Sequence, residues 1–125
     1  MNNTIKISKI SKTYEGKKKL KVLNNISYTF KKGKIYSLVG PSGSGKTTLL
    51  NILSLLDYST TGKLKIFERK IFNENKDEND NVRANSIGII YQNKNLLSDF
   101  NVLENVYLAS LALDKKKLEA KQNAK

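Results

Sequence analysis

The sequence predicts an α/β fold in which an N-terminal antiparallel β region leads into a core built around one glycine-rich loop. Three observations support this prediction. Residues 4–39 consist largely of short segments with alternating or β-prone side chains. Residues 40–47 contain two glycines with four residues between them, followed by Lys-Thr. Residues 48–56 are apolar on nearly every side and predict a buried helix.

The N-terminal region has the pattern of strands joined by turns. Residues 4–10 alternate apolar and polar side chains, which predicts a half-buried strand. Residues 20–23 and 26–30 predict two more extended pieces, interrupted by a pair of asparagines. The Lys-Lys-Gly at residues 31–33 predicts a turn. Together these segments predict an antiparallel β region that precedes the core.

The loop carries the residue types that hold the phosphates of a nucleotide. Its glycines let the backbone curl tightly, so that successive N–H groups point into one concavity. Lys46 supplies a movable positive charge for the β- and γ-phosphates, and Thr47 offers a hydroxyl to Mg²⁺. Thr48 begins a helix whose positive dipole end adds to the same site. The candidate cofactor-binding residues are Gly40, Pro41, Ser42, Gly43, Ser44, Gly45, Lys46, Thr47 and Thr48.

The segments on either side of the loop bear on whether it binds phosphate or merely connects two elements. Residues 34–39 are β-prone and predict a buried strand, and residues 48–56 predict the buried helix. A strand, a glycine loop and a helix in this order are the context in which the motif works. The alternative is a Gly/Ser-rich connector that binds nothing, and such a connector has no use for Lys-Thr at a helix start.

Apolar and polar segments alternate in the second half of the chain. Residues 63–67 predict a strand, and residues 73–85 predict a polar surface segment with a short helix near Val82-Arg83. Residues 87–91 predict an apolar strand that ends at Gln92.

A helix start is predicted near the end of the sequence. Asn101 and Glu104 have the spacing of a capping box, in the variant with Asn as the N-cap. The side chains that follow have the apolar spacing of one helix face.

The composition restricts the possible functions. The 125 residues contain no Cys and no His, which removes thiolate metal sites and the commonest general base. We find no secretory leader and no apolar run that could cross a bilayer, so we expect a soluble chain.

The formal charge of +12 suggests a polyanionic ligand, but the lysines are scattered without aromatic residues between them. We expect a solvated surface and no nucleic-acid partner, with an RNA- or DNA-binding protein as the alternative.

Four stretches of this chain resemble, in order, the first half of an ABC transporter ATP-binding subunit. The Leu-Leu-Asp after the first helix and the Asn-Leu-Leu after Gln92 are most similar to the branch that serves lipoprotein release and macrolide or peptide export. The matching stretches are residues 7–14, 40–51, 55–62 and 87–92, the last continued by residues 95–97 and 102–106.

This resemblance implies a P-loop NTPase core of the ABC ATPase type, with an N-terminal antiparallel β region. It implies that residues 1–125 are a single partial ATP-binding domain, truncated at its C-terminal side. Within it, residues 1–33 would be the antiparallel β region and residues 34–101 the P-loop core through the glutamine loop. Residues 102–125 would be the start of the helical subdomain, and the later core strands would be missing.

The roles known in the family fall on matching residues. Tyr14 resembles the aromatic residue that stacks on adenine, with a tyrosine packed on the edge of the β region as the alternative. Gln92 matches the glutamine that contacts Mg²⁺ and the attacking water, although in isolation it would be an ordinary residue at a strand end. The resemblance therefore implies Lys46 and Gln92 as catalytic residues, Thr47 and Gln92 as Mg²⁺ ligands, and ATP with Mg²⁺ as cofactors.

Three features of the family are absent from this sequence. No Ser-Gly-Gly signature follows Gln92, no apolar strand ends in Asp-Glu, and no His is present. Phosphoryl transfer needs several groups placed together, so we expect the binding half of the chemistry without useful hydrolysis by this chain alone. We also expect exposed apolar strand edges and marginal stability, because the missing strands would lie inside the sheet.

The resemblance implies an ATP-binding subunit, or a fragment of one, that binds Mg-ATP to power export or lipoprotein release. Its expected partners are membrane permease subunits and a second ATP-binding subunit, at the cytoplasmic face of the inner membrane. The alternative is a non-catalytic nucleotide-binding or regulatory fragment.

Overall fold

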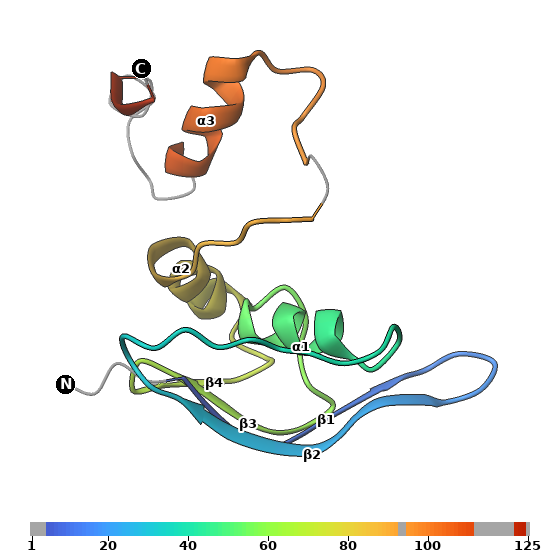
Figure 1. Ribbon diagram of the computed structural model, residues 1–125. Helices are drawn as coiled ribbons and strands as arrows, with labels where there is room; N and C mark the ends of the chain where they lie inside the picture. The colour runs from blue at the N-terminus through green and yellow to red at the C-terminus, as the bar shows by residue number, and fades with distance from the viewer. Residues whose placement is uncertain (1–4, 93–94, 112–121, 125) are drawn as a thin grey trace. The chain divides into compact units, whose positions relative to one another are not determined.

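The computed structural model describes residues 5–92, 95–111 and 122–124. The chain forms two compact units, residues 1–79 and residues 80–125. The first unit contains a four-stranded sheet and helix α1 (Lys46–Leu53), and the second contains helix α3 (Val102–Leu111) (Figure 1).

The sheet is antiparallel throughout, and it confirms the β region expected at the N-terminus. Its strands are β1 (Ile5–Tyr14), β2 (Leu20–Phe30), β3 (Thr61–Ile66) and β4 (Arg69–Ile71), in the order β2-β1-β3-β4. Strand β1 extends four residues beyond the end of the segment predicted from the alternation, because it continues from residue 10 to residue 14 beside β2.

Strand β2 is one continuous strand where the sequence predicted two pieces. The β1–β2 ladder shifts register around Ile10 instead of breaking, and Asn25 takes a positive φ of 54°. Asparagine tolerates this left-handed conformation better than most residues, so a bulge can absorb it. Near this bulge, two serine hydroxyls take the place of strand carbonyl groups as hydrogen-bond acceptors. Ser11 Oγ accepts from the Asn25 amide at 2.9 Å, and Ser27 Oγ accepts from the Lys9 amide at 2.8 Å.

The core of the first unit lies between the sheet and α1, which covers one sheet face (Figure 1). Leu64 and Ile66 are two residues apart on β3, so they lie on the same face of the strand, and both are buried. Leu49 and Ile52 are three residues apart on α1, so they lie on the same face of the helix, and both are buried. The helix is shorter than the predicted segment 48–56, because Ser54 is its C-cap and the residue after it has a positive φ. The buried apolar side chains of the sheet and α1 region are Ile7, Ile10, Leu23, Leu49, Ile52, Leu55, Leu64 and Ile66.

The hairpin between β3 and β4 was not predicted. Its two-residue turn consists of Phe67 and Glu68, whose φ angles of 47° and 73° are both positive. Hairpin turns of this kind usually contain Asn or Gly. Nothing in the sequence therefore marked a turn, and the predicted strand ended at Phe67 instead of Ile66.

The predicted strands at residues 34–39 and 87–91 are wrong. Neither segment belongs to the sheet, and Ile35 and Ile90 are each 100% exposed. A buried strand needs neighbouring strands to pair its backbone N–H and C=O groups, and no described segment of the chain supplies one here. Residues 34–39 are held instead by Tyr36, whose hydroxyl accepts from the Lys31 amide at 2.9 Å and whose ring meets those of two β2 aromatic residues.

Helix α2 (Lys76–Ser86) is longer than the short helix predicted near Val82-Arg83. Its first turn contains Asp77 and Glu78, which suit the positive end of the helix dipole. Asn79 is buried, and its amide donates to Phe72 O at 2.7 Å and to Tyr58 Oη at 3.3 Å. These bonds satisfy the buried amide and fix the start of the helix to the first unit.

The capping box predicted at the start of α3 is confirmed in both directions. The Glu104 amide donates to Asn101 Oδ1 at 2.9 Å, and the Asn101 amide donates to Glu104 Oε2 at 2.9 Å. The Asn105 side chain also ties the preceding loop to the helix, since its Oδ1 accepts from the Leu97 amide at 2.8 Å. No helix in the described part of the chain is long and apolar enough to span a bilayer.

The exposure of residues 34–39 can be tested by substitution. Ile35→Ser should change the free energy of unfolding by less than about 0.5 kcal/mol, because the side chain makes no buried contact. Ile52→Ala is the matched comparison and should cost about 2–5 kcal/mol, because Ile52 is 1% exposed. Urea denaturation followed by circular dichroism measures both. Equal losses for the two variants would show that residues 34–39 pack as a strand.

Candidate functional site

The glycine loop ends where α1 begins, and its backbone conformation depends on glycine. Gly43 and Gly45 have φ angles of 77° and 87°, and Gly45 is the N-cap of α1. A Cβ atom on Gly45 would lie 2.8 Å from Leu23 Cδ2 and 3.1 Å from Val22 O of strand β2. Only glycine allows both the left-handed conformation and this close approach of the loop to the strand.

The backbone amides in the first turn of α1 are the second feature of this site. The N-cap provides no side-chain acceptor, and among the described residues none accepts a hydrogen bond from the N–H groups of Lys46, Thr47 or Thr48. The first amide that is satisfied is that of Leu49, which donates to Gly45 O at 2.9 Å. The helix start therefore presents several free donors and the positive end of the helix dipole to one place.

The Lys46 side chain folds back over the same loop. Its ammonium donates to Gly40 O at 2.8 Å and to Pro41 O at 2.6 Å, with Ser44 Oγ at 3.4 Å. The loop and the start of α1 line a surface depression of about 520 Å³, formed by Val22, Ser42, Gly43, Gly45, Lys46, Thr47 and Thr48. An ammonium group and free amides around one depression form a site for a multiply charged anion.

These residues fit the phosphates of a nucleotide with a magnesium ion. Free amides and the Lys46 ammonium are donors without competing acid groups, which suits phosphate oxygens. Thr47 is exposed at the helix start and can offer its hydroxyl to Mg²⁺. The described residues contain no cluster of three or more acidic or His side chains that could hold a metal. A magnesium ion here would therefore have to share the phosphate oxygens, as Mg²⁺ commonly does.

Tyr14 takes part in a cluster with two residues that the sequence analysis did not single out. Its hydroxyl donates to Asp57 Oδ2 at 2.9 Å. Lys12 donates to Asp57 Oδ1 at 2.6 Å and to Tyr58 O at 2.7 Å, and its ammonium lies 4.8 Å from the centroid of the Tyr14 ring. The Tyr14 ring thus has a cation on one face, while the residue as a whole remains 40% exposed.

The environment of Asp57 favours its ionised form. Partial burial pushes the pKa of this carboxyl upward, but hydrogen bonds from Lys12, Tyr14 and the Tyr58 amide, together with the charge of Lys12, hold that pKa below its ordinary value. Asp57 is therefore a carboxylate with several donors directed at it, and it joins the end of β1 to the loop that follows α1.

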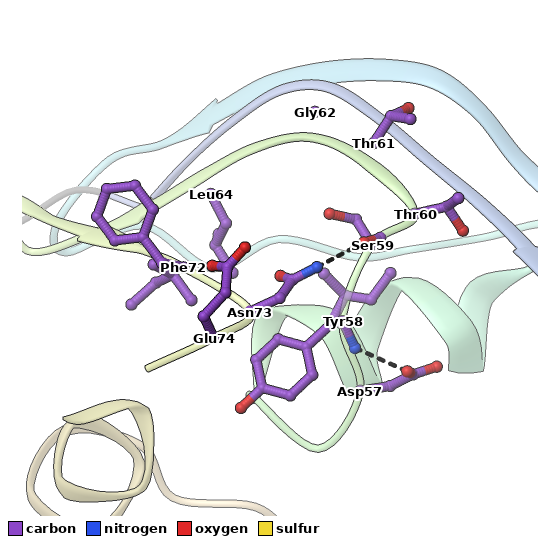
Figure 2. Close-up of a pocket in the computed structure, with 12 residues that line it drawn as sticks. Asp57, Tyr58, Ser59, Thr60, Thr61, Gly62, Leu64, Phe72, Asn73 and Glu74 are labelled. Carbon is purple, nitrogen blue, oxygen red and sulfur yellow. Dashed lines mark hydrogen bonds between the residues drawn. The ribbon is translucent and has the colours of Figure 1, made fainter. Parts of the chain in front are cut away.

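A second depression, of about 180 Å³, lies beside this loop (Figure 2). Figure 2 shows the Asn73 side chain reaching Ser59, to whose carbonyl oxygen it donates at 3.1 Å. The depression is lined by residues 57–62 together with Ile52, Leu64, Ile71, Phe72, Asn73 and Glu74. None of the glycine-loop residues, Lys46 included, lines this depression, so it is separate from the depression at the start of α1.

The structure places most of the predicted site residues in the first unit. The glycine loop, Lys46 and the threonines surround one depression, and Tyr14 lies on β1, which pairs with the strand that Gly45 touches. Gln92 lies in the second unit, and its role at Mg²⁺ and the attacking water stays a prediction.

Sequence reasoning missed Lys12 and Asp57 as members of the site. Two signals in the sequence pointed to these residues. Lys12 and Tyr14 are two residues apart and so share one face of a strand. Asp57 also belongs to the Leu-Leu-Asp that marked the resemblance.

A glycine loop that starts a helix with free amides, with a lysine folded over it, defines a phosphate-loop nucleotide-binding protein. A family model described as ABC transporter matches residues 23–125. The chain therefore belongs to the ABC transporter family, as its sequence motifs indicated.

Individual relatives agree with this assignment. The lipoprotein-releasing system ATP-binding protein LolD of Ehrlichia canis is 39% identical over 125 residues, which are 99% of this chain and 55% of the relative. The macrolide export ATP-binding/permease protein MacB of Campylobacter jejuni is 41% identical over 104 residues, covering 83% of this chain and 16% of the relative. The chain thus spans about half the length of the LolD proteins it matches.

A solved structure confirms the fold class. The dimeric, post-hydrolysis structure of the ATP-binding cassette MJ0796 with ADP and Pi superimposes with a TM-score of 0.84 at 34% sequence identity. The matched region covers 96% of this chain and 53% of that chain. The predicted fold, an α/β core of the ABC ATPase type with an antiparallel β region, is therefore confirmed.

The dependence of the loop on glycine can be measured. Gly45→Ala should destabilise the fold more than Gly33→Ala, although both positions have positive φ angles, of 87° and 71°. Each variant carries left-handed strain of roughly 1–2 kcal/mol, but only at Gly45 does the new methyl group meet neighbouring atoms. Urea denaturation should give Gly45→Ala an additional loss of about 1–3 kcal/mol. Indistinguishable losses would mean that the loop does not pack on β2 as described.

The ionisation of Asp57 predicts a pH dependence of stability. Its folded-state pKa lies below the ordinary value of 3.8, so its stabilising effect is complete above that value and is lost as the pH falls through the folded-state pKa. Asp57→Asn should therefore lower the free energy of unfolding near neutral pH, and its difference from wild type should shrink below about pH 4. Urea titrations across this range measure the difference. A difference that does not change with pH would contradict the ionised cluster.

Proposed function

We propose that this chain binds Mg-ATP through the glycine loop and the start of α1, as part of an ABC transporter ATP-binding subunit. The observation that carries the proposal is that no described residue accepts a hydrogen bond from the amides of Lys46, Thr47 and Thr48, which lie beside the Lys46 ammonium. The amides bind the phosphate oxygens. The Lys46 ammonium leaves the loop carbonyl oxygens and contacts the β- and γ-phosphates, and Thr47 offers its hydroxyl to Mg²⁺.

Two further residues complete the proposed nucleotide contacts. Tyr14 stacks on the adenine ring, which its partly exposed aromatic ring supports. Gln92 contacts Mg²⁺ and the attacking water through its amide, a role that rests on the family resemblance.

The relatives support a role in transport. Their names refer to a lipoprotein-releasing system and to macrolide export, and this favours a subunit that powers lipoprotein release or export through a membrane permease. The dimeric MJ0796 cassette supports pairing with a second ATP-binding subunit. The proposed location is peripheral, at the cytoplasmic face of the inner membrane, with no nucleic-acid partner.

Hydrolysis needs more groups than these 125 residues contain. The sequence has no Ser-Gly-Gly signature after Gln92, no apolar strand ending in Asp-Glu and no His. We therefore propose that this polypeptide alone binds Mg-ATP but does not turn it over at a useful rate. The second candidate, a non-catalytic nucleotide-binding or regulatory fragment, rests on the same observation. A phosphate-release assay beside equilibrium binding of Mg-ATP tests the lack of turnover, and release comparable to that of a full ATPase would contradict it.

Lys46→Ala tests the binding site directly. We expect the dissociation constant for Mg-ATP to rise by about 10-fold or more, because a charge-assisted contact to phosphate is lost. Lys32→Ala is the matched control, since it removes an equal charge from an exposed position outside the loop. Competition against a fluorescent ATP analogue measures both constants, with circular dichroism as a check on folding. Wild-type affinity in Lys46→Ala would refute the proposed site.

A further inference from the structure

We propose that the Asp57 carboxylate, braced by Lys12, is a positioning residue that holds the Tyr14 ring in the orientation that receives the base of a bound nucleotide. The proposal rests on the proposed function of the glycine loop and assigns a role to two side chains outside it. Asp57 touches neither the depression at the loop nor its residues, so it acts through Tyr14.

Each carboxylate oxygen of Asp57 has its own donors. Oδ2 accepts from the Tyr14 hydroxyl at 2.9 Å, while Oδ1 accepts from Lys12 Nζ at 2.6 Å and from the Tyr58 amide at 2.7 Å. A tyrosine side chain has two rotatable bonds before its ring, and anchoring the far end of the ring restricts both. Folding therefore already orders the ring, so the side chain loses less conformational entropy when a ligand binds.

The position of Lys12 leaves one face of the Tyr14 ring available to a ligand. Its side chain is only 12% exposed and is held by Asp57 Oδ1 and by Tyr58 O, so its ammonium is fixed 4.8 Å from the ring centroid. A base that stacks on Tyr14 must then use the opposite face of the ring. Lys12 also polarises the ring from its own side, which adds an electrostatic component to the stacking.

Asp57 also links the two ends of the proposed site. Its backbone is fixed to the end of α1, since the Asp57 amide donates to Asn51 O at 3.2 Å, and α1 starts at the glycine loop. Its side chain is fixed to β1 through Lys12 and Tyr14. The Thr60 amide adds a bond to Ser11 O at 2.9 Å. The carboxylate thus sets the position of the ring relative to the helix that holds the phosphates.

The role can be separated from general stability by comparing two ligands. Mg-ATP uses both the base contact and the loop, whereas magnesium tripolyphosphate uses the loop alone. Tyr14→Phe keeps the ring and removes the anchored hydroxyl, and Asp57→Ala removes the anchor. We expect each to weaken Mg-ATP binding about 3- to 10-fold, from the ordering of one side chain, and to leave tripolyphosphate binding unchanged. The double variant should be no weaker than Asp57→Ala alone, because both changes break one interaction.

Glu68→Ala is the control, since it breaks an exposed ion pair with Lys65 on the β3–β4 hairpin and should change neither affinity. Equal loss for both ligands in Asp57→Ala and Tyr14→Phe would mean that the cluster only supports the fold, and would overturn the proposal. Unchanged Mg-ATP affinity in both variants would overturn it as well, while the nucleotide site would stand. If wild type binds neither ligand, the proposed function itself fails, and this inference fails with it.

Discussion

The structure depends on the close approach of Gly45 to strand β2. The backbone of the loop lies so near Leu23 and Val22 that a methyl group on Gly45 would meet both. This contact fixes where α1 starts, and the start of α1 fixes where its free amides point. The antiparallel sheet therefore does more than supply a core. It also supplies strand β2, against which the glycine loop and the start of α1 lie.

A second constraint acts at the other end of α1. The chain leaves the helix through a left-handed residue and returns to the sheet, where Asp57 meets Lys12 and Tyr14. The helix is thus attached to β2 by its first residues and to β1 by the loop after its last. Because it is attached at both ends, the short helix sets the spacing between the glycine loop and the Tyr14 ring.

The sequence allowed prediction of the features that depend on neighbouring residues. The glycine loop and the Asn101–Glu104 capping box have fixed local spacings, and the structure contains both. The strands at residues 34–39 and 87–91 failed because strand formation depends on distant partners, which local side-chain preference does not reveal. The Lys12–Asp57 pair joins positions 45 residues apart, so the local signals at each position did not show that the two side chains meet.

The same contrast between local and distant contacts distinguishes phosphate binding from phosphoryl transfer. The proposed phosphate contacts come from one loop and the first turn of one helix, supported by two residues of an adjacent strand. Few chain segments must be ordered to form them, so the entropic cost of assembling the site is small. Hydrolysis requires groups from several separate segments to be positioned together, and each additional segment adds to that cost. Of the two steps, the proposed binding of the phosphates is therefore the one that needs the fewest chain segments to be brought together.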